Sequence, residues 1–173
     1  YAFAYDHNFA RAHSGLGGLV VRDRAGSYGL SFTTIAMSYS YEARLDRRRA
    51  LRFGFRTGYT IRNVAPDGYL FADQIIRDNA PTSIEANMVP QTGYLDLATG
   101  ALYYSEQFWA GFSFNHINRP NQTLMVDGDA PLQMRMTFHT GYRFALDGHK
   151  LTRSETKMTI AGHYKAQGKW DQL

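Results

Sequence analysis

Two neighbouring segments, 35–45 and 51–61, alternate between apolar and polar residues, and this alternation limits what the chain can fold into. The apolar residues take the odd positions, namely Ile35, Met37, Tyr39, Tyr41, Ala43 and Leu45, then Leu51, Phe53, Phe55, Tyr59 and Ile61. Side chains of a β-strand point to opposite faces in turn. The pattern therefore predicts a β-hairpin with one apolar and one polar face, closed by a charged turn at 46–49.

The hairpin register follows from the same alternation. The two apolar faces coincide only if the loop holds an odd number of residues or a bulge. If Leu45 opposes Leu51, Glu42 lies diagonally between Arg52 and Arg56, where opposite charges would stabilise the pair of strands.

Similar alternation recurs along the chain and predicts eight strands, no helix and a single domain over 1–173. The further strands are expected at 1–9, 15–23, 94–104, 108–117, 132–146 and 158–165. Between 94 and 117 the apolar positions change parity. We expect even positions such as Leu102, Tyr104 and Phe112 to share the apolar face, with a bulge near 98–100 to reconcile Leu95 and Leu97.

A wall that is apolar on one side and polar on the other suits a soluble sandwich or barrel, or a membrane barrel with lipid outside. The mean hydropathy of −0.40 does not separate them, because alternating strands dilute their apolar residues. The connections do favour a membrane barrel: long loops at about 63–93 and 118–131 contrast with short links after the third, fifth and seventh strands. The expected strands are also longer than is usual in soluble sheets. Since Tyr1 already lies in an alternating run, we interpret the chain as part of a longer barrel.

No catalytic or metal site can be assembled from the sequence. The six histidines lack metal-ligand spacing, and only His139 and His163 are expected on adjacent strands. Asp127–Asp129 lacks the remaining ligands of a calcium loop and is better interpreted as a polar turn. We expect no cofactor. A lipid-modifying barrel enzyme with a Ser/His site stays open as an alternative. The net charge of +4 is spread over strands and turns, which argues against nucleic-acid binding.

Basic residues recur on the predicted polar face and are the candidate lumen-facing residues: Arg52, Arg56, Arg62, Arg135, His139 and Arg143. They would bias a water-filled interior against cations. The role that we favour for the arginines is pairing with Glu42 and other carboxylates of the lining. On the apolar face, Phe55 and Phe138 are expected to meet lipid, whereas charges at Thr60 or Thr137 are expected to be tolerated.

Several runs of the sequence resemble the PorP/SprF family. They are, in order, GLGGLVVRDRAGSYGLS, YSYEARLDRRRALRFGFRTGY, YYSEQFWAGFSFNHINRPNQTL, MRMTFHTGYRF and YKAQGKWDQL. The resemblance extends over essentially the whole chain and corresponds to a middle portion of the family. No single run is a catalytic signature.

The resemblance implies an outer-membrane β-barrel of the type IX secretion and gliding machinery, without enzymatic activity. Its expected partners are the periplasmic ring, lipoproteins, a secreted adhesin or other cargo protein, and outer-membrane lipid. The family offers no residue-level motif to transfer. A pore with an arginine-lined lumen remains the alternative function, and a soluble β protein the alternative class.

Overall fold

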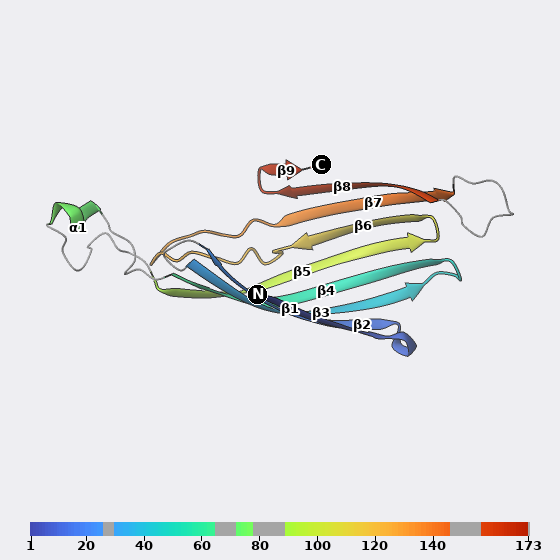
Figure 1. The fold of residues 1–173 in the computed structure, drawn as a ribbon, viewed down its shortest axis with the longest axis horizontal. Coiled ribbons are helices and arrows are strands. Elements are labelled where there is room, and N and C mark those ends of the chain that lie inside the picture. The colour runs from blue at the N-terminus through green and yellow to red at the C-terminus, as the bar shows by residue number, and fades with distance from the viewer. Residues whose placement is uncertain (26–29, 65–71, 78–88, 146–156, 173) are drawn as a thin grey trace.

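The computed structural model describes residues 1–25, 30–64, 72–77, 89–145 and 157–172. These residues form one nine-stranded sheet in which every strand pairs antiparallel with its neighbours in the sequence (Figure 1). The strands are β1 Ala2–Phe9, β2 Ser14–Ala25, β3 Leu30–Arg44, β4 Arg49–Asn63, β5 Gln91–Ser105, β6 Phe108–Asn115, β7 Arg135–Ala145, β8 Lys157–Gln167 and β9 Trp170–Gln172. The all-β antiparallel fold predicted from the sequence is confirmed.

The hairpin of β3 and β4 forms as predicted, but its register differs. Residues 45–49 separate the paired Arg44 and Ala50, so the loop has an odd length and the apolar faces coincide. Leu51, however, pairs with Ala43 and not with Leu45, which was the wrong expectation. The shift places Glu42 directly opposite Arg52, a closer arrangement than the predicted diagonal one.

The predicted apolar face of β5 was also wrong. The register of β5 is continuous against both β4 and β6, so no bulge interrupts it near 98–100. Tyr103 pairs with Leu51 and Ala110, which places the odd positions of β5 on the apolar face. Leu102 and Tyr104 therefore lie on the polar face. Because these two residues have large apolar side chains, the sequence suggested that the apolar face had changed from odd to even positions.

Three short elements were not predicted. The strand β9 follows a turn at Gly168, whose φ of 61° suits a glycine. The 3-10 helix η1 (Ala10–Ala12) joins β1 to β2, and the helix α1 (Ala72–Ile76) lies in the link between β4 and β5. The rest of that link is mostly outside the described residues. In the other long link, Gly128 N–H bonds to the Met125 carbonyl at 3.3 Å, which confirms a turn at the start of the Asp127–Asp129 run.

The strand ends advance steadily across the sheet. The hairpin of β1 and β2 ends at the row that contains Tyr41, and β3 continues beyond this row to Arg44. β7 in turn continues to Ala145, beyond Tyr142, the partner of Phe108 at the start of β6. A stagger of this kind accompanies the tilt of strands in a barrel wall. It is consistent with a curled sheet rather than a flat one (Figure 1).

One face of the sheet is apolar and exposed from β1 to β8. It carries Phe3, Tyr5, Leu16, Ile35, Met37, Tyr39, Phe53, Phe55, Leu95, Phe112, Phe138, Tyr142 and Ile160, all classed as exposed. Along β3 and the first residue after it, this face extends from Ile35 to Leu45, about the ten residues that a tilted membrane strand needs. The opposite, polar face holds small buried residues such as Ala36 and Ala98. Among the described residues, no helix has the length and apolar character to cross a membrane.

Arginine substitutions on adjacent residues of β7 test the assignment of faces. Phe138→Arg places a charge near the middle of the apolar band and should lower the free energy of unfolding by about 2–4 kcal/mol in lipid vesicles. Phe55→Arg, at a similar level on β4, should behave in the same way. Thr137→Arg, on the polar face next to Phe138, is the matched control and should have a much smaller effect. Equal losses for Phe138→Arg and Thr137→Arg in urea unfolding would refute the assignment.

Thr60 was expected to tolerate a charge equally well, but the structure makes it unsuitable as a control. Its side chain is on the polar face as predicted, yet it is buried, and its hydroxyl lies 2.8 Å from that of Thr34.

Candidate functional site on the polar face

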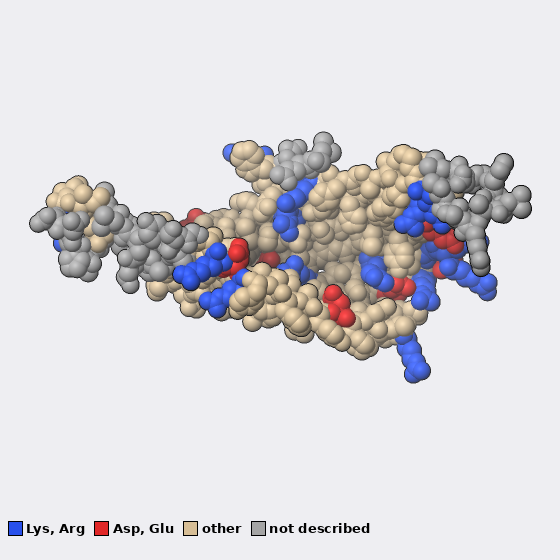
Figure 2. Space-filling model, viewed as in Figure 1, with Lys and Arg blue, Asp and Glu red and all other residues tan. Residues whose placement is uncertain are grey.

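The polar face is hollowed where small residues meet across β1 to β6. A hollow of about 590 Å³ is lined from Asp6 on β1 across to Ser113 on β6. Strands so far apart in the sheet can line one hollow only because the sheet curls toward its polar side. Figure 2 shows charged side chains within this concave side and at the end that carries the short turns.

Glycines make room for larger side chains on this face. A Cβ at Gly17 would overlap the carboxylate of Asp6, and one at Gly141 would overlap the ring of Trp109. A Cβ at Gly111 would lie 2.7 Å from Cε1 of His139. Each larger side chain thus lies over a glycine of the neighbouring strand, which limits how far it projects from the sheet.

All six candidate lumen residues lie on the polar face by register. Arg52, Arg56 and Arg62 alternate along β4 with outward-facing residues, and Arg52 and Arg56 line the hollow. Arg135, His139 and Arg143 are on the same face of β7. His139 pairs directly with His163 of β8, as the strand order suggested. A binding role for these residues stays a prediction.

The densest polar cluster is centred on Glu42. Its carboxylate accepts hydrogen bonds from Arg52 at 2.5 Å and from the Tyr104 hydroxyl at 2.6 Å, and Arg44 Nε lies 3.1 Å away. The guanidinium of Arg52 also lies 5.8 Å from the centre of the Tyr104 ring. The Glu42 side chain is only 15% exposed. This cluster joins β3, β4 and β5, and it favours the pairing role over a free cationic surface for Arg52.

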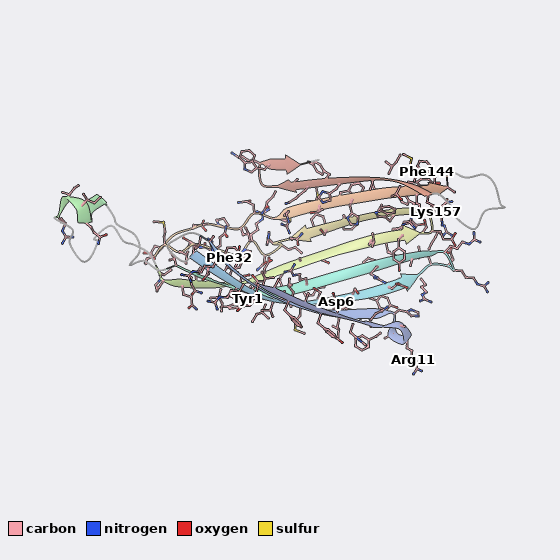
Figure 3. All side chains as sticks on the ribbon, in the orientation of Figure 1. Tyr1, Asp6, Arg11, Phe32, Phe144 and Lys157 are labelled. Carbon is pink, nitrogen blue, oxygen red and sulfur yellow. The ribbon has the colours of Figure 1, made fainter. Side chains whose placement is uncertain are left out.

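The short-turn end carries a second charged group, formed by turn residues and by Arg49 at the start of β4. The backbone N–H of Arg48 and the Arg49 guanidinium both donate to Asp46, which holds the pKa of this carboxyl below its ordinary value. Arg48 lies 3.5 Å from Glu106 and so links the β3–β4 turn to the β5–β6 turn. Arg11, Phe144 and Lys157 mark the same end of the sheet in Figure 3, and Phe32 marks the opposite end.

Hydrogen bonds from its own side chains organise the link between β6 and β7. Asn118 donates to the Leu95 carbonyl and accepts from the Leu97 N–H, at 2.6 and 3.1 Å. Asn121 accepts from Thr123 N–H and Ala130 N–H and donates to the Gly128 carbonyl. The guanidinium of Arg62 then fixes this link to β4 through the Gln122 carbonyl at 2.8 Å.

His116 and Asp96 form the one His–carboxylate pair on the described part of the chain, with Nδ1 and Oδ1 2.8 Å apart. Within the same residues, no serine hydroxyl is hydrogen-bonded to His116, and no group of three or more potential metal ligands converges. The pair anchors the start of the β6–β7 link to β5. The sequence alone does not predict the pair, because Asp96 is on β5 whereas His116 is the first residue after β6.

The exposed apolar face, the curled antiparallel sheet and the polar interior together define a membrane β-barrel wall. The comparisons with known proteins agree with this class. The family model of the type IX secretion system membrane protein PorP/SprF matches residues 1–173. The chain belongs to the PorP/SprF family and is a membrane component of the type IX secretion system. Searches of curated proteins and of solved structures find no match.

Substitutions in the Glu42 cluster should reveal its contribution to stability. Glu42→Gln leaves Arg52 and Arg44 without their carboxylate and should lower the free energy of unfolding by about 1–2 kcal/mol. Tyr104→Phe removes one hydrogen bond and should cost about 1 kcal/mol. Because Glu42 and Tyr104 share one hydrogen bond, the losses should be less than additive in the double variant.

Glu106→Gln is the matched control for the same charge change. Its ion pair with Arg48 is exposed, so we expect no measurable change in urea unfolding. The proposed cluster would be contradicted if Glu42→Gln were as silent as this control.

Proposed function

We propose that this chain is a non-enzymatic wall segment of an outer-membrane barrel that connects periplasmic type IX components with secreted surface proteins. Family membership supports a role in the type IX secretion system. The sheet, with one exposed apolar face and one polar face, supports a location in a lipid bilayer. The observation that carries the proposal furthest is the contrast between the two ends of the sheet, because each end offers a different kind of surface.

The short-turn end is the proposed periplasmic side. Membrane barrels carry short turns there and longer loops outside. In this chain the turns at 45–48 and 106–107 are compact and charged, and Arg48 and Glu106 connect them. Such a surface suits the periplasmic ring or a lipoprotein, whose contacts would be polar and accessible without entering lipid.

The opposite end is the proposed surface for a secreted adhesin or other cargo. It carries the links 64–90 and 116–134. The second of these holds a defined shape through Asn118 and Asn121, and it exposes Met125 beside the turn. A preformed loop with an exposed apolar side chain is suited to binding a protein partner, since little ordering is required on association.

We also propose that strands outside residues 1–173 complete the barrel. β1 and β9 are the edges of the described sheet, and they do not pair with each other. Open edges are not tolerated in lipid, because their backbone groups would have no hydrogen-bond partners.

Affinity purification of the full-length protein from solubilised outer membranes, followed by mass spectrometry, tests this function. The wild type should retain type IX periplasmic components and a secreted protein. Arg47→Glu with Arg48→Glu should reduce the periplasmic partners only, whereas Met125→Asp should reduce the secreted protein only. Each variant serves as the control for the other. Recovery of the barrel alone, under conditions that preserve other membrane complexes, would contradict the proposal.

The second candidate function is a pore, favoured by the hollow and by the arginines that line it. Arg56 projects into the hollow and has no ion pair within the described ranges. An uncompensated cation of this kind would bias an aqueous path toward anions.

Planar-bilayer recordings of the full-length barrel distinguish the pore from the partner-dependent function. A pore should conduct in the absence of partners, and Arg56→Glu should shift its selectivity toward cations. The exposed Arg47→Glu, which carries the same charge change in a turn, should leave the selectivity nearly unchanged. A silent wild-type barrel that assembles normally would exclude an open pore.

A further inference from the structure

The apolar outward face of β2 ends in two arginines. The side chains of Leu16, Val20, Arg22 and Arg24 lie on one side of this strand, as their pairing with Tyr39, Ile35, Thr33 and Ser31 shows. Leu16 and Val20 thus lie in the apolar band, whereas Arg22 lies at its end, in the row of Ile61, and Arg24 lies beyond it. Successive side chains on one face are about 7 Å apart, so both guanidinium groups can reach a single anionic group between them.

On the neighbouring strands the apolar band ends at the row of Arg22, which contains Thr33, Ile61 and Gly93. The next outward row, that of Arg24, contains Ser31, Asn63 and Gln91. This polar boundary is at the end that carries the long links. Phe32, which pairs with Asp23, marks its level in Figure 3.

Within the described residues, the two arginines lack the carboxylate partners that Arg48 and Arg49 have at the other end. Arg22 and Arg24 are exposed, and within the described residues neither is in an ion pair. The carboxylate between them, Asp23, belongs to the opposite face of the strand and accepts from the Arg24 backbone N–H at 2.9 Å. At the short-turn end, by contrast, Arg48 and Arg49 are paired with Glu106 and Asp46.

We propose that Arg22 and Arg24 form a binding site for the phosphate of a membrane lipid in the leaflet on the long-loop side. Arginine stems can lie along apolar surface while the guanidinium groups reach the headgroup level. Guanidinium groups bind phosphate through two parallel charge-assisted hydrogen bonds. The acyl chains of the same lipid would contact Val20 and Ile35, which the register places side by side just inside the boundary.

This inference rests on the proposed membrane orientation but not on any protein partner. In the outer membrane, the leaflet on that side contains phosphorylated lipid A anchors. These supply both the phosphate and the acyl chains that the surface requires.

Native mass spectrometry of the full-length protein with bis-phosphorylated lipid A tests the site. The wild type should retain this lipid, and Arg22→Gln with Arg24→Gln should weaken retention on the order of tenfold or more. Arg47→Gln, which removes one positive charge at the other end, should bind like the wild type. Dephosphorylated lipid A should bind weakly to all three proteins.

Three results would overturn the proposal: equal retention by the wild type and the double variant, equal binding of phosphorylated and dephosphorylated lipid, or displacement of the lipid by millimolar inorganic phosphate. The last result would indicate a site for a free anion. Labelling of single cysteines in the long links on intact cells checks the orientation separately. A failed lipid test with surface-labelled loops would therefore refute this site and leave the proposed function intact.

Discussion

The structure depends on one constraint. Every strand must pair its backbone N–H and C=O groups with those of neighbouring strands, and must also present one apolar and one polar face. The continuous antiparallel ladder from β1 to β9 meets the first requirement. Strict alternation meets the second, with Phe55 and Phe138 outward and Arg56 and His139 inward. In hydrocarbon an unpaired backbone group is costly, so the ladder cannot be interrupted within the membrane. Variation is therefore concentrated in the turns and links, and these differ between the two ends of the sheet.

Alternation was enough to predict the strands and most of their faces, because side-chain period is a local property of the sequence. It failed where single apolar residues lie on the polar side. Leu102 and Tyr104 line the interior at the end of β5, and Tyr104 is there because its hydroxyl binds Glu42. A tyrosine has an apolar ring and a polar tip, so sequence alone does not decide which of them determines its side. The register of the hairpin of β3 and β4 was also predicted wrongly. A shift of the pairing by two residues leaves the apolar faces together, so the residue pattern cannot choose between such registers, and the geometry of the turn decides.

The candidate site was predictable by face but not by contact. The six basic residues of β4 and β7 could be assigned to the polar side from parity. The partners of Arg52 could not, because Tyr104 joins the cluster only through the pairing of β4 with β5. Likewise Asp96 and His116 meet across two strands and the start of a link. Such contacts are set by non-local register, whereas the helix α1 and the strand β9 are too short to leave a periodic signal.

After β6 has ended, the Asn118 side chain makes the hydrogen bonds to the backbone of Leu95 and Leu97 on β5 that the backbone of a longer β6 would otherwise make. Together with Asn121 it separates the β6–β7 link into a fixed base and a tip. The wall therefore does not depend on which residues form the tip between Thr123 and Asp129. Relatives could exchange this tip to recognise different proteins while the barrel beneath keeps its register. The two asparagines would thus separate the barrel wall, whose sequence must preserve the strand register, from the tip of the link, whose sequence is free to diverge.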